Sequence, residues 1–462
     1  MNDSTITAVA TPLGSGGIGI IKISGKDALP IAESIFIKRQ KKDKKKFESH
    51  RLYLGNIVDK EKNKKIDEVL LTVMKAPNSY TREDVVEINA HSGIVALNEI
   101  IGLVLKNGAR LAQPGEFTKR AFLNGRIDLT QAEAVIDIIN AKSEKSLEIA
   151  NSQIEGKLKT KIGSIRENVI QLLCMIEAGI DFPEEEIESL DKETIKGRIK
   201  ADLVTPLTQL LNNFQSGQVY KDGIRLVVAG KPNVGKSSLM NRMANKERAI
   251  VTALPGTTRD IIEETIKING IPAIISDTAG LHNTKDTVEV LGIEKAYEQI
   301  KLADIVLFMI DASWPLTEED EKIFQELTHK KKIIVINKID LVNKNGMIKI
   351  PESWHAIKTV QISALYNKGI DQLNRVIFKM FTGEGAIDPN SAIIPNIRHK
   401  KEIEKSMQAL SRAKKCLEGE ETSLELIAID FQEAIDSLGK ILGVSVKEEI
   451  VERIFEKFCI GK

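Results

Sequence analysis

The chain has 462 residues, with 66 Lys and Arg against 65 Asp and Glu, which gives a formal net charge of +1. This length predicts two to four domains, and the low net charge excludes a general attraction to nucleic acid, so any such binding must be local. Cys174, Cys416 and Cys459 indicate neither a disulfide framework nor a zinc site, which favours a cytoplasmic location. No apolar run reaches the roughly 18–20 residues of a membrane span, and the polar start does not resemble a signal peptide.

Residues 1–120 alternate short apolar runs with turns marked by Gly and Pro, a mix typical of a small α+β domain. A helix is predicted from Val95 to Leu105. The predicted strands are Ile18–Ile23, Glu68–Val73 and Asp84–Ile88. The basic run Lys38–Lys46 is interpreted as a solvated loop between elements, with nucleic-acid contact as the alternative.

Residues 121–215 change to a helical pattern. Thr130 and Glu133 indicate a capping box at a helix start. The apolar residues that follow at near-helical spacing are Val135, Ile138, Ile139, Leu147, Ile154 and Leu158. Cys174 lies in an apolar run and is predicted to fill the core, and Pro183 opposes continuation of the helix before it.

The next block, residues 216–381, is predicted to be an α/β nucleotide domain. A turn-rich stretch, Ser216–Gly223, is expected to lead into it, followed by a strand at Ile224–Ala229. The sequence GKPNVGKS then begins at Gly230 and matches a phosphate-binding loop, with a helix beginning near Ser237.

The residue types of this loop suit a polyphosphate bound with Mg²⁺. Gly230 and Gly235 let successive backbone N–H groups turn toward the phosphate oxygens, and the following helix presents its positive end to them. Lys236 can then reach the β- and γ-phosphates, and the Ser237 hydroxyl can bind Mg²⁺. The alternative is a chance match on a glycine-containing turn.

Two later strands are predicted to deliver further parts of the site. The strand Pro272–Ser276 ends at Asp277, which can bond a Mg²⁺-bound water, while the Gly280 N–H can approach the γ-phosphate. The strand Lys332–Ile336 ends before Asn337, at the carboxyl edge where open α/β sheets bind ligands.

The residues after the second of these strands favour GTP over ATP. The Asp340 carboxylate has two acceptor oxygens for the two adjacent N–H donors of guanine, which adenine lacks. Asn337 is expected to bond the other edge of the base, and the stem of Lys338 to cover its face. The Ala364 N–H, between Ser363 and Leu365, is expected to back the base.

Switch I is expected between the phosphate loop and the strand near Ile266. Thr258 is interpreted as the second Mg²⁺ ligand there, with a simple turn residue as the alternative. Leu281 stands where many small GTPases have a water-orienting glutamine, and leucine cannot orient water. Another group must therefore assist hydrolysis, and Asp286 and Glu289 are the candidates, with a solvated loop as the alternative.

The charge of the transition state also needs a neutralising group, either an arginine or a monovalent cation. The side-chain oxygen of Asn233 and the backbone carbonyls around Thr252–Thr257 could form a cation site.

Taken together in their order along the chain, the segments of the nucleotide domain resemble the GTPases of the translation-factor-like class. The residues expected to form the nucleotide and cation sites are Asn233, Val234, Gly235, Lys236, Ser237, Ser238, Thr252, Ala253, Leu254, Pro255, Gly256, Thr257, Thr258, Asp277, Thr278, Ala279, Gly280, Asn337, Lys338, Asp340, Ser363, Ala364 and Leu365.

After residue 382 the chain is helical again, so the blocks 121–215 and 382–462 are interpreted as one helical domain that the nucleotide domain interrupts. Motifs outside the nucleotide domain resemble the MnmE (TrmE) family of tRNA-modifying GTPases. They are Ala10–Ile20, Pro77–Asp84, Pro114–Asn124 and Phe458–Lys462.

The resemblance implies a homodimer whose N-terminal domain, residues 1–120, binds 5-formyl- or 5,10-methylene-tetrahydrofolate. It also implies a heterotetramer with the FAD protein MnmG (GidA), which would add a carboxymethylaminomethyl or aminomethyl group to C5 of the wobble uridine of certain tRNAs. By the same resemblance, K⁺ is bound by Asn233 with Thr252, Leu254 and Thr257, and Glu289 activates water.

The folate contacts implied by the resemblance are Lys22, Glu87, Arg126 and Lys462. Lys22 and Arg126 have their basic residue types exchanged relative to the family's form, which keeps the charge but changes the donor geometry. Cys459 is implied as a candidate for the chemistry, with a small residue near a helix end as the alternative. A GTP-regulated assembly or ribosome-maturation factor is the alternative function.

Overall fold

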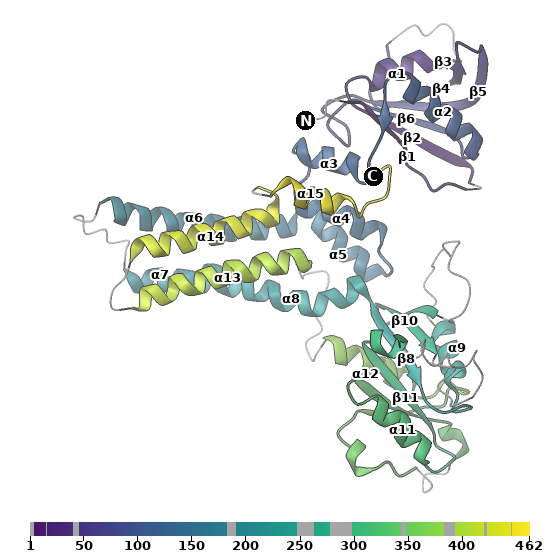
Figure 1. Cartoon of the computed structure of the whole chain (residues 1–462), viewed down its shortest axis with the longest axis vertical. Helices are drawn as coiled ribbons and strands as arrows, with labels where there is room; N and C mark the ends of the chain where they lie inside the picture. The colour runs from purple at the N-terminus through teal and green to yellow at the C-terminus, as the bar shows by residue number, and fades with distance from the viewer. Residues whose placement is uncertain are drawn as a thin grey trace. The chain divides into compact units, whose positions relative to one another are not determined.

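A computed structural model of the chain is shown in Figure 1. The structure describes residues 4–14, 16–39, 46–182, 191–246, 263–277, 298–342, 348–382, 393–419, 423–444 and 446–462. The chain forms two compact units, which are Met1–Ile136 with Ile154–Gly197 and Glu404–Lys462, and Asp137–Gln153 with Arg198–Ile403. Among the described residues, no helix combines the length and the apolar character that a membrane crossing requires.

The first unit begins with a seven-stranded sheet in the order β3-β4-β5-β6-β2-β1-β7, antiparallel except for the pair β1 and β7. Its elements are β1 (Ile6–Val9), β2 (Ile18–Ser24), α1 (Ala28–Ile35), β3 (Phe36–Lys38), β4 (Arg51–Asp59), β5 (Lys64–Met74), β6 (Val85–His91), α2 (Ile94–Lys106), β7 (Arg110–Leu111) and α3 (Glu116–Leu123). The strands and the helix predicted in this block are confirmed, with ends that differ by a few residues.

The alternation of buried and exposed side chains along the strands shows which face of this sheet the helices cover. In β5, Val69 and Leu71 are buried, whereas Leu70 between them is exposed. Successive side chains of a strand point to opposite faces, so the buried set packs with α1 and α2 in one core. The opposite face carries Leu70 together with Leu52 and Leu54 of β4, all three exposed.

The basic run at 38–46 is not wholly a loop. Lys38 is the last residue of β3, and its ammonium group lies 4.6 Å from the ring centroids of both Phe47 and Tyr53. This arrangement is a cation–π contact, which keeps the lysine on the sheet. The remainder of the run, from residue 40 to 45, lies outside the described residues.

The helices that lie mainly in the first unit are α4 (Leu129–Ile139), α6 (Lys157–Asp181), α7 (Lys192–Arg198), α13 (Ile397–Glu418), α14 (Leu424–Leu442) and α15 (Glu448–Phe455). Helices α6 and α14 lie side by side, although most of the sequence between them belongs elsewhere (Figure 1). Fully or nearly buried side chains recur along α6 at spacings of three and four, as Leu158, Ile162, Ile165, Val169, Leu172 and Ile176. This period presents one apolar face to the neighbouring helix.

The predicted core position of Cys174 is wrong. Cys174 is exposed, because it lies two residues from both Leu172 and Ile176 and therefore falls on the other side of α6. The helix ends at Asp181, before Pro183, as the sequence predicts.

The predicted capping box at the start of α4 is also misplaced. Asp128 Oδ1 accepts hydrogen bonds from the backbone N–H groups of Thr130 at 2.7 Å and Gln131 at 3.1 Å. The Gln131 side chain accepts from the Asp128 N–H at 3.0 Å. The reciprocal pair is therefore Asp128 and Gln131, while Thr130 and Glu133 are buried within the helix.

The second unit contains a six-stranded sheet in the order β13-β12-β11-β8-β10-β9, parallel except for the edge strand β9. Its strands are β8 (Ile224–Ala229), β9 (Glu263–Ile268), β10 (Ile271–Asp277), β11 (Ile305–Asp311), β12 (Lys332–Asn337) and β13 (Thr359–Gln361). Its helices are α5 (Glu144–Ile154), η2 (Ile199–Val204), α8 (Thr205–Asp222), α9 (Lys236–Lys246), α11 (Glu318–Glu326), η3 (Ile339–Leu341), η4 (Glu352–Trp354) and α12 (Ile370–Thr382).

Residues 216–222 are helical, and the prediction of this stretch as a turn is wrong. They form the last part of α8, which ends at Asp222 and is followed by Gly223 as its C-cap, with φ of 76°. Glycine is required at position 217 of this helix, because the Cβ of any other residue would lie 2.4 Å from the buried side chain of Ile394. Close packing, and not a turn, accounts for that glycine. Tyr220 is buried in the same core as β8.

Replacing Asp128 by Ala is expected to lower the free energy of unfolding by about 0.5–2 kcal/mol, because two backbone N–H groups of α4 lose their acceptor. Urea denaturation followed by circular dichroism measures the change. Asp128→Asn keeps an acceptor oxygen and is the matched control, for which most of the stability should remain. Equal losses for both variants would contradict the capping role.

Candidate functional site

The loop between β8 and α9 has a backbone that requires glycine at two positions. Gly230 has φ of 150°, and a Cβ there would lie 2.3 Å from the carbonyl oxygen of Met309. Gly235 has φ of 102°, and its Cβ would lie 2.3 Å from the side-chain nitrogen of Asn337. Any other residue would displace a neighbouring strand or loop, so the glycines set the shape of this loop.

The side chain of the loop's lysine, Lys236, contacts backbone carbonyl groups at the start of the loop. Lys236 Nζ is 2.8 Å from the carbonyl oxygen of Gly230 and 3.0 Å from that of Lys231, and the side chain is buried. Ser237 and Ser238 follow in the first turn of α9 and are exposed. Asn233 is exposed, with φ of 64°. A buried ammonium group, N–H groups at a helix start and a nearby hydroxyl fit a phosphate with its Mg²⁺.

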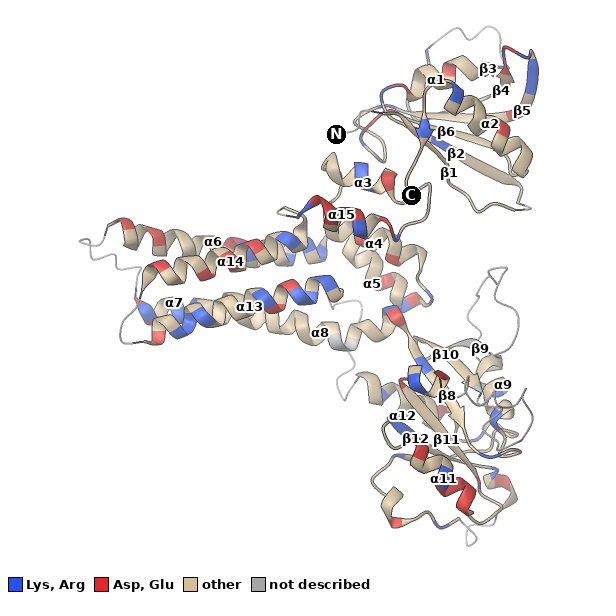
Figure 2. Ribbon diagram, in the orientation of Figure 1, with Lys and Arg blue, Asp and Glu red and all other residues tan. Residues whose placement is uncertain are grey.

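A second lysine ties the loop to α11. Lys231 Nζ lies 2.6 Å from a carboxylate oxygen of Asp320 and 3.0 Å from Thr317 Oγ1. Asp320 is buried and forms a capping box with Thr317 at the start of α11, whose first turn is acidic (red in Figure 2). The sequence pattern did not single out this pair, although Thr317 and Asp320 have the spacing of a capping box.

Asn337 joins three segments of the nucleotide site. Its side-chain nitrogen donates to the Val234 carbonyl at 2.8 Å, and its side-chain oxygen accepts from the Ala364 N–H at 3.0 Å. The side chain is buried, with 2% exposure. The structure therefore places both polar ends of Asn337, and the Ala364 N–H, in contacts within the protein. Their contact with the base stays a prediction.

The neighbours of Asn337 lie at the carboxyl edge of the sheet, as predicted. Lys338 Nζ is 2.6 Å from a carboxylate oxygen of Asp311 at the end of β11. Burial raises the pKa of Asp311, but the hydrogen bonds from Lys338 and Ser313 outweigh it and hold the pKa below its ordinary value. Asp340, in η3, is exposed. Its exposed carboxylate suits a ligand that approaches from solvent.

The segment after β13 completes this edge. Ser363 is fully buried, and its hydroxyl accepts the backbone N–H of Tyr366 at 3.2 Å. Leu365 is exposed. Arg242 of α9 donates to the carbonyl oxygens of Ala364 at 3.1 Å and Leu365 at 2.6 Å, which connects this segment to the helix after the phosphate loop.

Several predicted site residues lie outside the described residues. They are Thr252, Ala253, Leu254, Pro255, Gly256, Thr257, Thr258, Thr278, Ala279, Gly280, Leu281, Asp286 and Glu289. Asp277 is described as the last residue of β10, where its backbone pairs with Val228 of β8. This pairing places it on the strand next to the one that enters the phosphate loop.

In the first unit, two of the four residues implied for folate form a pair. Lys22 of β2 and Glu87 of β6 are directly opposite each other, with 3.8 Å between Nζ and Oε1. The pKa of Lys22 lies below its ordinary value, because burial and the charge of Lys462 lower it more than Glu87 raises it. Lys462 is thus close enough to act on the pair.

The segment Cys459–Lys462 reaches this pair through contacts with the start of α3. The Gly115 N–H donates to the Cys459 carbonyl at 3.4 Å, and the Phe117 N–H donates to the Lys462 carbonyl at 3.2 Å. Gly461 has φ of 91°, and a Cβ there would lie 2.5 Å from the Val9 carbonyl oxygen. Cys459 itself is exposed.

Arg126 lies at a cavity of about 570 Å³ in the first unit. Its guanidinium carbon is 4.7 Å from the centre of the Tyr80 ring, and its Nη1 donates to the Tyr80 carbonyl at 3.2 Å. The cavity is also lined by His50, Asn78, Ser79 and Arg82. Sequence reasoning without the resemblance missed this cavity, because its residues come from separate turns. A clue was the polar segment at 77–84.

Comparison with known proteins assigns the family. The description "GTP-binding protein TrmE N-terminus" matches residues 5–126, and "MnmE helical domain" matches residues 129–459. The tRNA modification GTPase MnmE of Carboxydothermus hydrogenoformans is 47% identical over 467 residues, which cover all of both chains. The protein of the same name from Acetivibrio thermocellus is 48% identical and covers 100% of this chain and 99% of its own.

The chain belongs to the MnmE family. The predicted fold class is confirmed: it combines an N-terminal α+β domain, an all-α domain and a Ras-like α/β GTPase domain with a phosphate loop. The enzyme is a GTP hydrolase. Among solved structures, Aquifex aeolicus Era bound to GDP·AlF₄⁻ is 30% identical, and it covers 40% of this chain and 67% of its own with a TM-score of 0.30. That score is too low to add to the assignment, which rests on the family match.

Asn337→Ala is expected to weaken GTP binding about tenfold, because leaving the buried Val234 carbonyl and Ala364 N–H without their partner costs about 1–3 kcal/mol. Titration with a fluorescent GTP analogue measures the affinity. Asn337→Asp keeps the acceptor but loses the donor, and is expected to give an intermediate value. Unchanged affinity in Asn337→Ala would contradict the bridging role.

Proposed function

We propose that this MnmE-family chain is a Mg²⁺-dependent, K⁺-activated GTPase that acts with MnmG (GidA) on C5 of the wobble uridine of certain tRNAs. The product is a carboxymethylaminomethyl or aminomethyl group, built with a one-carbon unit from 5-formyl- or 5,10-methylene-tetrahydrofolate. GTP hydrolysis drives or regulates the modification. The observation that carries the proposal is the Lys22–Glu87 pair on two strands, with the segment that ends at Lys462 packed against Val9 of the neighbouring strand. It occurs in a family whose relatives are named tRNA modification GTPases.

The charges at this meeting point suit a folate. Folates have N–H donors on the pterin ring and carboxylates on the glutamate tail, so both an acceptor and cations are needed. Glu87 can accept from the pterin, and Lys22, Lys462 and Arg126 can neutralise the tail. A pair already held at 3.8 Å and partly buried would lose little freedom on binding.

The open face of the N-terminal sheet supports a homodimer. Leu52, Leu54 and Leu70 are 60%, 42% and 42% exposed. The register places Leu54 directly opposite Leu70, so these side chains form a contiguous apolar area on two strands. Such an area on a sheet face is typical of a surface that another chain covers. A second copy of this chain, in a cytoplasmic heterotetramer with MnmG, is the proposed arrangement.

GTP hydrolysis is expected to be faster in KCl than in NaCl at matched ionic strength, by about tenfold or more, which is below the roughly 10³–10⁵ of an arginine finger. The physical reason is that K⁺, held by Asn233 and the carbonyls of Thr252 and Leu254 with Thr257, replaces the arginine's charge. Phosphate release measures the rate.

Glu289→Ala is the companion variant in the same assay. If Glu289 activates water, this variant should lose the stimulation by KCl while GTP binding remains. Equal rates of the unmodified chain in KCl and NaCl would refute the cation proposal. Retained stimulation in Glu289→Ala would refute the glutamate's role.

Gly461→Ala is expected to abolish wobble-uridine modification when it replaces the natural chain in a strain that lacks it. The added Cβ would lie 2.5 Å from the Val9 carbonyl, at a φ of 91°, and would displace Lys462 and Cys459. Mass spectrometry of tRNA nucleosides measures the modification. Gly163→Ala is the matched control, because a Cβ there would meet no atom of the described residues within 4 Å beyond the neighbouring backbone of α6. Full modification with Gly461→Ala would contradict the proposal.

A further inference from the structure

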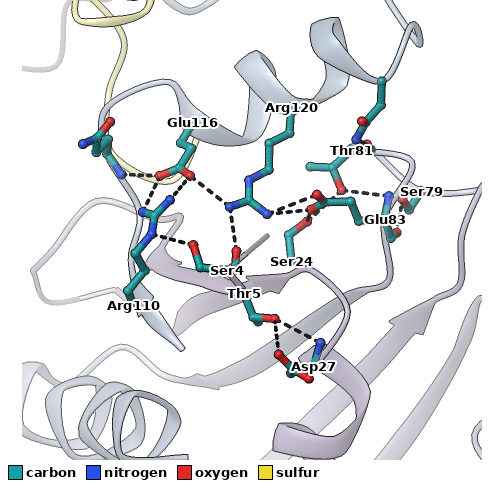
Figure 3. A network of polar contacts seen from close by, with 12 residues as sticks. Ser4, Thr5, Ser24, Asp27, Ser79, Thr81, Glu83, Arg110, Glu116 and Arg120 are labelled. Carbon is teal, nitrogen blue, oxygen red and sulfur yellow. Dashed lines mark hydrogen bonds and ion pairs between the residues drawn. The ribbon is translucent and has the colours of Figure 1, made fainter. Parts of the chain in front are cut away.

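Arg120 of α3 is a nearly buried cation between two carboxylates (Figure 3). Its Nη1 lies 3.0 and 3.1 Å from the carboxylate oxygens of Glu83, and its Nη2 lies 3.0 Å from Glu116. Nη2 also donates to the carbonyl oxygen of Ser4 at 2.8 Å, and the Arg120 side chain is only 10% exposed. Among the described residues, none of these bonds joins Arg120 to a residue predicted for the folate site.

Through Glu116, Arg120 reaches the segment Cys459–Lys462. Glu116 also accepts from both Nη atoms of Arg110, at 2.8 and 2.5 Å, and from the Gln113 N–H at 2.9 Å. Burial raises the pKa of Glu116, but these hydrogen bonds outweigh it, so the pKa lies below its ordinary value and the carboxylate stays charged. The bonds fix the first turn of α3, whose N–H groups hold the Cys459 and Lys462 carbonyls.

Through Glu83, Arg120 reaches the turn that carries Tyr80. Glu83 accepts from Ser24 Oγ at 2.7 Å, and its backbone carbonyl accepts from Ser79 Oγ at 2.5 Å. Ser24 Oγ is also 2.7 Å from Thr81 Oγ1. Thr81 is therefore bonded directly to Ser24 at the end of β2, and Ser79 is connected to it through Glu83. Tyr80 in turn lies under the guanidinium of Arg126.

We propose that Arg120 is a positioning residue that holds the two halves of the folate site in register. One half is Cys459–Lys462, which is held through Glu116, and the other is Tyr80 with Arg126, which is held through Glu83. Because Arg120 bonds both carboxylates, its loss removes the link between the two halves, although Arg110 still bonds Glu116. This inference rests on the proposed function, since it assigns a role to Arg120 in the same site.

The test compares Arg120→Met with the unmodified full-length chain. The dissociation constant for 5-formyl-tetrahydrofolate, measured by calorimetry, is expected to rise about tenfold or more, because Glu83 and Glu116 lose the cation that they share, although Glu116 keeps Arg110. The GTP hydrolysis rate should stay within about twofold, since the second unit keeps its contacts. Hydrogen–deuterium exchange should become faster in peptides that contain Gly115–Phe117 and Ser79–Glu83.

Conservative variants and a matched control separate positioning from general stability. Arg120→Lys keeps the charge but not the forked geometry, so an intermediate affinity is expected. Glu83→Gln is nearly isosteric and serves if Arg120→Met does not fold; it should speed exchange at Ser79–Glu83 first. Arg412→Met is the control, because Arg412 of α13 also bonds two carboxylates, those of Asp430 and Glu433 on α14. Helix α13 is rich in basic residues (blue in Figure 2). It should leave folate affinity unchanged.

The outcomes distinguish this inference from the proposed function. If the unmodified chain binds no folate, the proposed function fails, while the exchange measurements still report whether Arg120 couples the two segments. If folate binds but Arg120→Met leaves both its affinity and the exchange unchanged, the positioning role is refuted. An equal loss of affinity in Arg412→Met would also refute it, because a general loss of stability would then explain the effect.

Discussion

The first unit depends on the contact between the start of α3 and the segment Cys459–Lys462. Two backbone N–H groups, of Gly115 and Phe117, are donors at a helix start, where no acceptor within the helix is available. By bonding the carbonyls of Cys459 and Lys462, they bring residues near position 460 to a sheet formed by the first 111 residues. The segment that ends at Lys462 consequently reaches Val9 of β1, which pairs with Ile21 next to Lys22 on β2. The charges in Figure 3 keep α3 in the position that this requires.

The nucleotide site follows a similar rule, in that a buried polar group connects loops which come from different strands. Asn337 bonds the phosphate loop through Val234 and the segment after β13 through Ala364. A buried amide without partners would be costly, so its two bonds make these loops depend on one another. Lys338 with Asp311 and Lys231 with Asp320 add ion pairs at the same edge. These contacts connect the loops at the edge that GTP would contact.

Much of this was predictable where the signal is local. The strands β8, β10, β11 and β12 follow from runs of apolar residues, and the phosphate loop follows from its glycines. Prediction failed where packing decides. Cys174 is in an apolar run but on the outer side of α6, and Gly217 is accommodated in α8 by Ile394. The amide side chain of Asn337 could bond a base as well as backbone groups, and only its contacts in the folded chain show that it bridges two loops.

The sequence by itself determined the kinds of elements, their order, the GTPase motifs and the family, because periodicity, glycine positions and residue identity are properties of short segments. The tertiary structure alone decided that Arg120 links Glu83 to Glu116 and that Asp128 caps α4 with Gln131. The physical reason is that hydrogen bonds and ion pairs act over about 3–4 Å between atoms. Separation along the sequence says little about which atoms come that close.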